Sequence, residues 1–213
     1  MLVIGVGTGC KDLGPFLTNC TKRYEATGIF GVSYDTDDVT GTLLCEKPFD
    51  HITEQQIQES LTKSFTGKIM QRPPSFSAKK INGVRAFEIA RKIQSQLGSV
   101  NDGAEMIPEL TLPSREITVF SIRLTSVMLP SFTISMDVSS GTYVRAILRD
   151  LGKELNTEAS MSALNRTRQG VFTISDCMNV NDILDADKGF DRVVDAISNS
   201  KRIIENASNF QIY

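Results

Sequence analysis

The sequence is poor in the side chains that bind zinc or form histidine-based catalytic triads. It has one histidine, His51, and its four cysteines lie far apart with no C-x-x-C pair. Structural zinc sites and histidine-dependent nucleophiles need these residues in larger or closer sets. We therefore expect no metal site and assign any chemistry to carboxylate, Tyr, Arg or Lys side chains. Isolated cysteines of this kind are expected to be small buried hydrophobic residues.

The sequence also lacks a long apolar run and a secretory signal. Its longest apolar run is far shorter than a transmembrane helix requires, and no basic region precedes an apolar stretch at the amino terminus. With 213 residues, 40% of them hydrophobic and 23% charged, the chain predicts a globular protein with one core and an appendage. We expect it to be intracellular. The sequence does not distinguish nucleus, cytoplasm and mitochondrion, and it leaves the oligomeric state open.

Charge is nearly balanced overall but unevenly distributed. The net charge is −2, which by itself argues against a nucleic-acid-binding protein. Acidic residues gather at 35–38 and at 176–195, whereas basic residues form two clusters elsewhere. Such a basic face on an acidic chain is compatible with RNA binding, and a solvated surface is the alternative. The first cluster is Lys68, Arg72, Lys79, Lys80, Arg85, Arg91 and Lys92; the second is Arg145, Arg149, Lys153, Arg166 and Arg168.

Hydrophobic periodicity and turn residues predict an α+β fold with a mixed, mainly antiparallel sheet and flanking helices. Residues 99–114 are expected to form a connecting loop. The predicted strands are 2–9, Thr21–Tyr34, Thr40–Glu46, Arg115–Met128, Phe132–Val138 and Arg166–Ile174. The predicted helices run from the Thr53 cap to Gly67, from Val84 to Leu97, from Tyr143 to Leu155, briefly near Ser160, and as an acidic pair over Asn181–Ile197.

The amino-terminal LVIGVGTGC predicts a short strand that ends in a glycine turn. Gly5, Gly7 and Gly9 would let a nucleotide or methyl donor approach the backbone closely. A small-molecule transferase that uses this turn is therefore one alternative function. A dinucleotide-binding fold needs repeated β-α units after the turn, whereas a predicted strand pair follows here.

The segment SSGTYVRAILRDLGKEL, residues 139–155, predicts a helix that opens with a Gly-Thr-Tyr turn. Arg145 and Arg149 are four residues apart and fall on one helix face. Together with Tyr143 and the backbone amides of the helix start, they could hold a phosphate or a carboxylate. The alternative is a surface helix with two solvated arginines.

Four segments in order carry a resemblance to a known family: KRYEATGIFGVSYDTDDVTG, QRPPSFSAKKINGVRAFEIAR, SSGTYVRAILRDLG and ALNRTRQGVFTI. They resemble the TruB-type tRNA pseudouridine synthases, and KPFDHIT and FTGKIMQ suggest the eukaryotic branch. The resemblance covers about residues 1–175 and implies a pseudouridine synthase catalytic domain, with an acidic helical extension over 176–213. Such enzymes flip a uridine out of the tRNA T loop and isomerise it without metal or organic cofactor.

The resemblance also implies roles for individual residues. Tyr24 would stack on the target base and contribute to catalysis. Tyr143 and Arg145 would border the catalytic carboxylate, with Arg145 paired to it. The rings of Tyr24 and Tyr143 are expected to open into one cleft. Asp38 would support the fold of its loop.

The same resemblance implies a substrate-binding set around the catalytic residues. Leu164 would form a wall of the base pocket, and Lys80 and Arg166 would lie near the RNA backbone. Phe87 stands where the family often has Tyr, which removes one hydroxyl. The implied partner is tRNA at its T loop, or another RNA with a similar hairpin.

One departure from the family concerns the nucleophile. The family places its aspartate in a G-G-T-L-D motif immediately upstream of the strand matched by LVIGVGTG, and this chain begins at Met1 inside that strand. We therefore expect a catalytic domain incomplete at its amino terminus, inactive as written, with apolar surface exposed near Leu2 to Val6. Two readings remain open: an incomplete form of an enzyme, and a catalytically dead RNA-binding protein with the same surface.

Overall fold

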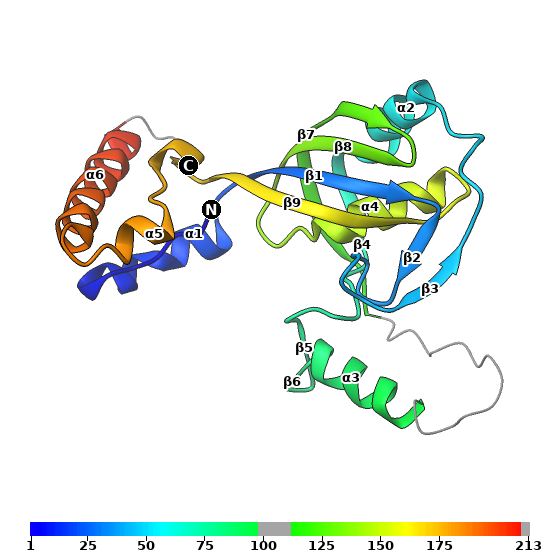
Figure 1. The fold of residues 1–213 in the computed structure, drawn as a ribbon, viewed down its shortest axis with the longest axis horizontal. Helices are drawn as coiled ribbons and strands as arrows, with labels where there is room; N and C mark the ends of the chain where they lie inside the picture. The colour runs from blue at the N-terminus through cyan, green and yellow to red at the C-terminus, as the bar shows by residue number, and fades with distance from the viewer. Residues whose placement is uncertain (98–111, 210–213) are drawn as a thin grey trace.

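Figure 1 shows the computed structural model, which describes residues 1–97 and 112–209. Most of the connecting loop expected at 99–114 lies outside the described residues. Six strands form one sheet in the order β10-β9-β1-β8-β7-β4, and every neighbouring pair is antiparallel. The predicted α+β class is confirmed. The strands of this sheet are β1 (Lys22–Phe30), β4 (Gly67–Gln71), β7 (Arg115–Met128), β8 (Ser131–Val138), β9 (Ala159–Gln169) and β10 (Phe172–Thr173).

Two helices share the hydrophobic core with one face of this sheet. Helix α2 is Glu54–Ser64 and helix α4 is Val144–Glu154. Strand β8 buries every second residue, as expected for a strand with one face against a core. The buried cluster combines these strand residues with apolar residues of both helices. Its members include Ala26, Phe30, Ile57, Leu61, Phe132, Ile134, Met136, Val138, Ile147, Leu148 and Leu151.

Helix α2 begins at the predicted cap. The Thr53 hydroxyl accepts a hydrogen bond from the Gln56 amide, and the Gln56 side chain accepts one from the Thr53 amide. This reciprocal pair satisfies two backbone donors that the helix leaves free. Ile57 and Leu61 then face the core one turn apart, so the capped helix presents its apolar stripe to the sheet.

Gly31 ends β1 and starts a separate two-stranded ribbon. Its φ of +88° lies in the left-handed region, where a side chain would be strained. Beyond it, β2 (Val32–Tyr34) pairs with β3 (Leu43–Glu46), which confirms a strand pair but gives β1 different neighbours, β8 and β9. The loop between β2 and β3, residues 35–42, lies against β9 through a parallel bridge from Asp38 to Met161.

The segment after β4 carries a small hairpin that periodicity did not predict. Residues 72–79 contain no regular element, in agreement with the predicted proline loop. Strands β5 (Lys80–Ile81) and β6 (Val84–Arg85) then form the hairpin that leads into α3, Ala86–Leu97. Two-residue strands are too short for a periodic signal. The expected proline loop therefore covers β5, and the expected helix from Val84 covers β6.

The helix predicted near Ser160 is wrong. Asn156 has a φ of +57°, which ends α4, and the chain then enters β9. Pairing along the whole of β1 outweighs the weak local preference for a helix. The strand predicted at Arg166–Ile174 therefore begins earlier, at Ala159, and ends at Gln169 before the short β10.

Helix α4 approaches the sheet closely at Gly152. A Cβ placed on this glycine would lie 2.4 Å from the backbone nitrogen of Ala159 and 2.6 Å from the carbonyl carbon of Glu158. Such distances are well inside van der Waals contact. The absence of a side chain at this position therefore allows α4 to pack on the start of β9.

The amino-terminal strand expected at residues 2–9 is not formed. Residues 2–6 contain no regular structure, and η1 (Gly7–Leu13) is a 3-10 helix followed by α1 (Gly14–Thr18). No neighbouring strand pairs with this segment in the described residues. Leu2, Ile4 and Val6 are 71%, 68% and 55% exposed, so the expected exposed apolar surface is confirmed.

The carboxy-terminal helices lie beyond the start of β1 and the end of β9 (Figure 1). They comprise η2 (Ile174–Asp176), α5 (Val180–Ile183) and α6 (Gly189–Asn209), which confirms a terminal helix pair. Helix α1 packs at the same end, since the Phe16 ring lies 5.3 Å from the Phe172 ring. The buried positions expected for the cysteines are wrong: Cys10, Cys45 and Cys177 are exposed and Cys20 is intermediate, all with free thiols.

Candidate functional site

The start of α4 is fixed by a buried glutamine from β4. Gln71 is 1% exposed, and its side-chain amide donates to the Tyr143 carbonyl over 3.0 Å. Its side-chain oxygen accepts a hydrogen bond from the Tyr143 amide over 2.9 Å. Tyr143 occupies the cap position of the helix, as predicted, without capping it through its own side chain. Hydrophobic periodicity does not select Gln71, because it is a polar residue at the end of a short strand.

Arg145 connects the helix to two loops. One guanidinium nitrogen donates to the Thr36 carbonyl over 2.7 Å and to the Asp38 carboxylate over 3.0 Å. The other donates to the Phe76 carbonyl over 3.0 Å. Side chains of Arg145 and Asp38 are 23% and 17% exposed, so this pair is partly shielded from water. Arg145 thus has a carboxylate partner within the described residues, contributed by the 35–42 loop.

Asp38 organises its own loop, in agreement with the role implied for it. Its carboxylate accepts hydrogen bonds from the Thr36 hydroxyl and from the amide and hydroxyl of Thr40, besides the Arg145 contact. Burial raises the pKa of this carboxyl, but the Thr40, Thr36 and Arg145 contacts outweigh it and leave the pKa lowered. Asp38 is therefore ionised at neutral pH and holds the loop against α4.

Arg149 does not form the anion site that its spacing from Arg145 suggested. It is 5% exposed and donates to Asp37 over 2.8 Å, to Asp150 over 2.9 Å and to the Arg72 carbonyl over 2.9 Å. Both alternatives for this residue, phosphate holder and solvated arginine, are therefore wrong. The four-residue spacing correctly places Arg145 and Arg149 on one face of the helix. The segments that cover this face, 35–42 and 72–77, are far from α4 in the sequence.

The two site tyrosines, Tyr24 and Tyr143, lie on different elements, β1 and the cap position of α4. Tyr143 carries the Arg115 guanidinium over its ring at 5.3 Å, an arrangement typical of cation–π contacts. Tyr24 lies in β1 between Met136 of β8 and Arg166 of β9, and its half-buried side chain packs against the core cluster. A common cleft for these two rings remains a prediction.

The three residues expected to bind substrate lie on different elements. Leu164 is 46% exposed on β9, opposite Ala26. Lys80 is exposed on β5, away from the main sheet (Figure 1). Arg166 is half-buried on β9 and donates to the Met1 carbonyl over 2.7 and 3.2 Å. Their roles in binding remain predictions.

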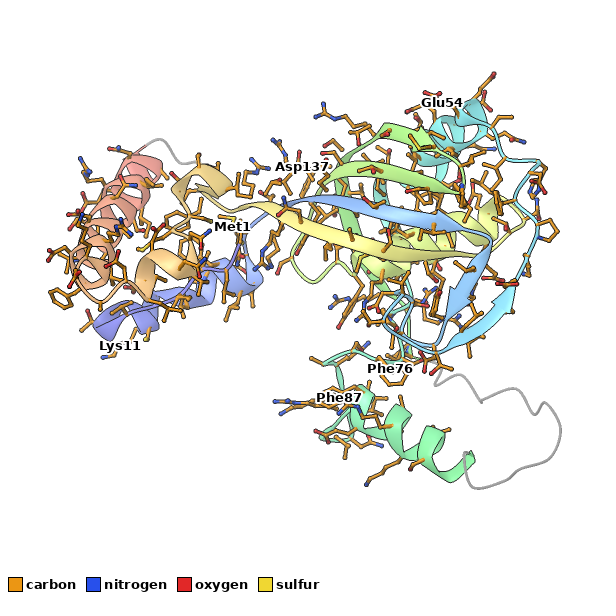
Figure 2. All side chains as sticks on the ribbon, viewed as in Figure 1. Met1, Lys11, Glu54, Phe76, Phe87 and Asp137 are labelled. Carbon is orange, nitrogen blue, oxygen red and sulfur yellow. The ribbon has the colours of Figure 1, made fainter. Side chains whose placement is uncertain are left out.

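Two residues of the first basic cluster, Arg85 and Arg91, lie over an aromatic ring. Arg85 and Arg91 place their guanidinium groups 5.9 and 5.4 Å from the ring of Phe87, and both arginines are exposed. Figure 2 shows Phe87 on the hairpin and α3 segment, which projects from the sheet. Since Lys80 pairs with Arg85 across this hairpin, the segment presents several positive charges together.

Four of the five residues of the second basic cluster, Arg145, Arg149, Arg166 and Arg168, make hydrogen bonds within the chain. Asp137 on β8 accepts two hydrogen bonds from Arg23 of β1, at 3.0 and 2.8 Å. It accepts another from Arg168 of β9 at 2.8 Å and one from the Ser121 hydroxyl at 3.1 Å. Sequence clustering of arginines therefore does not correspond to a free basic surface here.

Two further surveys concern the described residues alone. Within 1–97 and 112–209, His, Cys, Asp and Glu nowhere gather in threes in a way that could hold a metal ion. No helix among these residues has the length and apolarity needed to cross a membrane.

The residues around the glycine turn do not support the transferase alternative. That reading needs a strand leading into the turn, and residues 2–6 have no regular structure. The turn itself continues as the 3-10 helix η1.

Comparison with known proteins identifies first the fold and then the family. A chain of the solved "Structure of H/ACA RNP bound to a substrate RNA containing 2'-deoxyuridine" shares the fold with a TM-score of 0.50 and 19% identity, covering 82% of this chain and 36% of that one. Residues 1–144 match the TruB family pseudouridylate synthase N-terminal domain, and residues 145–197 match the tRNA pseudouridylate synthase B C-terminal domain. The chain therefore belongs to the TruB family of pseudouridylate synthases.

Relatives of known name agree with this membership. The human pseudouridylate synthase TRUB1 is 39% identical over 176 residues, which is 83% of this chain and 46% of the human protein. The tRNA pseudouridine synthase B of Parabacteroides distasonis is 34% identical over 185 residues, covering 87% of this chain and 72% of that protein. The chain thus spans about half the length of its human relative.

Proposed function

We propose that this chain acts in a tRNA pseudouridine synthase that isomerises a uridine of the T loop. The observation that carries the proposal is the place of Arg145, the second residue of the helix that Tyr143 opens, with its guanidinium 3.0 Å from the Asp38 carboxylate. Family membership supports the reaction, and the projecting basic hairpin supports the RNA partner. The proposed substrate places the activity inside the cell.

The reaction needs a positioned carboxylate and a pocket for a flipped base. The bond between ribose C1′ and base N1 breaks, the base turns and C1′ joins C5, while C5 loses its proton and N1 gains one. Atoms and electrons balance without an oxidant or cofactor. Extruding the base from its stack exposes both the bond and the ring to the enzyme.

The site residues have distinct roles in this proposal. Tyr24 stacks on the flipped base, and Leu164 closes one side of the pocket. Arg145 orients the nucleophilic carboxylate, with Tyr143 beside it. Lys80 contacts the RNA backbone, where a positive charge favours every sequence equally.

Arg166 would contribute a second backbone contact, but it also holds the Met1 carbonyl in the described structure. The nucleophile itself is proposed to reside in the family's G-G-T-L-D motif. The printed sequence does not contain that motif, so we propose catalysis for a form that carries it ahead of Met1.

The experiment compares the 213-residue chain with a form extended by the G-G-T-L-D motif. Both receive a T-stem-loop RNA, and pseudouridine is mapped by carbodiimide labelling and primer extension with EDTA present. We expect conversion by the extended form alone and salt-sensitive RNA binding by both. An extended form whose motif aspartate is changed to Asn is the matched control. Conversion by the unextended chain would contradict the assignment, as would an extended form that binds the RNA without converting it.

A further inference from the structure

The face of α4 that carries Arg145 also carries a second, deeper contact of the same kind. Arg145 donates hydrogen bonds to the Asp38 carboxylate and the Phe76 carbonyl. Arg149 donates to the Asp37 carboxylate and the Arg72 carbonyl. Each arginine thus joins α4 to one aspartate of the 35–42 loop and to one carbonyl of the 72–77 segment. The two sets of contacts lie one helical turn apart.

The Asp37–Arg149 pair is the more enclosed of the two. Its side chains are 13% and 6% exposed, against 17% and 23% for Asp38 and Arg145. Asp37 also has a φ of +60°, an uncommon conformation for a residue other than glycine. The loop backbone is bonded on both sides of this point, since the Met161 amide donates to the Asp37 carbonyl and the Val39 amide donates to the Met161 carbonyl.

The 72–77 segment held by this pair leads directly into the basic hairpin. The Phe87 amide donates to the Ser77 carbonyl and the Ala86 amide donates to the Lys79 carbonyl, which ties the hairpin to the segment. A shift of the segment at Arg72 therefore moves the hairpin with it. Arg145 shares the same segment through Phe76, so both movements are coupled.

We infer that Asp37 and Arg149 are positioning residues that set the place of Arg145 and of the basic hairpin relative to the base pocket. The inference rests on the proposed function for its RNA readout, but the geometry it describes exists in the protein alone. Neither side chain is exposed enough to bind a phosphate. Their effect on RNA must therefore pass through the loop and the segment that they join.

The charges that face Asp37 define how pH acts on this pair. Arg149, Arg145 and Lys153 approach it from α4, and Asp38 follows it on the loop. Burial raises the pKa of Asp37 to about 6, and the three cations lower it only in part. Asp37 is therefore ionised at neutral pH and becomes protonated in mildly acidic solution. Because its pKa is higher in the enclosed loop than in water, this protonation favours the enclosed loop.

The first test uses the 213-residue chain without RNA. Hydrogen exchange of the Met161, Val39, Ala86 and Phe87 amides is followed in wild type and in Arg149→Met, at pH 7.5 and 5.5 after correction for intrinsic rates. We expect about tenfold faster exchange at these amides in the variant, and slower exchange in wild type at the lower pH, because protonation of Asp37 favours the enclosed loop. The matched control is Lys47→Met, which breaks the Lys47–Glu158 ion pair of 2.6 Å between the residue after β3 and the residue before β9. Unchanged exchange in Arg149→Met would overturn the inference.

The second test measures affinity for a labelled T-stem-loop RNA. We expect Arg149→Met to bind about tenfold more weakly than Lys47→Met. We also expect the effect of Lys80→Ala to shrink in the Arg149→Met background, because a displaced hairpin no longer brings Lys80 to the RNA. Fully additive effects of the two substitutions would overturn the inference, since a role in overall stability alone produces them.

A final comparison separates the inference from the proposed function. Asp37→Asn should flatten the change in exchange between pH 7.5 and 5.5, because it removes the titrating group. If the wild-type chain fails to bind the RNA while these exchange differences appear, the proposed function is wrong and the positioning role stands. If it binds RNA and exchange is unaffected, the positioning role is wrong.

Discussion

The side chain of Gln71 and the backbone of Tyr143 form a closed pair of hydrogen bonds, one in each direction, at 3.0 and 2.9 Å. The two residues are 72 positions apart in the sequence. This contact fixes the end of β4 to the first residue before α4, so the helix that carries Arg145 begins at a defined place above the sheet. An amide side chain suits the task because it presents a donor and an acceptor side by side.

Replacing Gln71 with Leu should destabilise the fold by about 2 kcal/mol, because the Tyr143 amide would lose its acceptor and the Tyr143 carbonyl would keep only the Ile147 amide. Urea unfolding followed by circular dichroism measures this loss. Gln58→Leu is the control, since Gln58 is exposed on α2 and should change stability by less than about 0.5 kcal/mol. Equal stability of the two variants would mean that the Gln71 contact contributes little.

Lys80→Ala should weaken binding of T-stem-loop RNA irrespective of sequence and lower the salt dependence of the binding constant by about one ion. The reason is that Lys80 is exposed on the projecting hairpin. Arg166→Ala should also weaken binding. Affinity measured across a range of salt concentrations by fluorescence anisotropy tests both.

Lys63→Ala is the matched control for these two substitutions, because Lys63 lies at the end of α2, on the far side of the sheet from the hairpin (Figure 1). It removes the same charge and should leave RNA affinity nearly unchanged. A loss as large as that of Lys80→Ala would show that only net charge matters and would remove the argument for a specific RNA-binding hairpin.

The stability contributed by Asp37 should fall as pH rises. Its pKa is raised from 3.8 to about 6 by burial, so the native state binds a proton more tightly than the unfolded chain does. The wild type should therefore gain stability relative to Asp37→Asn as the solution is acidified through pH 6 toward the ordinary value. The relative gain should be roughly 3 kcal/mol, since each pKa unit is about 1.4 kcal/mol. Guanidinium unfolding of both proteins over this range measures it, and a difference that does not change with pH would contradict the buried carboxyl.

Asp137 should behave in the opposite way. Burial raises the pKa of this carboxyl, but hydrogen bonds from Arg23 and Ser121 and the charge of Arg168 outweigh it and leave the pKa lowered. Its stabilisation is therefore present above the ordinary pKa of an aspartate and is lost as pH falls through the lowered value. Asp137→Asn should cost about 2 kcal/mol at neutral pH, with a smaller cost in acid. A cost that grows in acid would show that the sign is wrong.

Local patterns predicted the elements whose signals are self-contained. The Thr53 cap with Gln56, the alternation in β8 and the helix opened by Tyr143 all depend on residues within one turn or one strand, and each is confirmed. The assignment of Ser160 to a helix is wrong because the preference of that stretch is set by pairing with β1, more than a hundred residues earlier. Strand β9 shows no regular alternation of buried and exposed residues, so its pairing with β1 could not be inferred from its own sequence.

The candidate site shows the same division. Family resemblance selected Arg145 and Asp38, and the structure brings these two together. The resemblance could not select Asp37 as the partner of Arg149, because that contact depends on how the 35–42 loop folds over α4. The proposed boundary of the catalytic domain at residue 175 remains a prediction, as do the roles of Tyr24, Leu164 and Lys80.

The contact at Gly152 has a consequence for residues that lie far from it. Helix α4 is an almost rigid rod, and Gly152 is seven residues, or about 10 Å, beyond Arg145 along its axis. A methyl group at Gly152 would push the carboxy-terminal end of α4 away from β9 and tilt its amino-terminal end. Arg145 bonds three acceptors on two separate loops, so it tolerates little tilt. The position that Arg145 must keep at the start of α4 therefore restricts residue 152, near the end of the helix, to glycine.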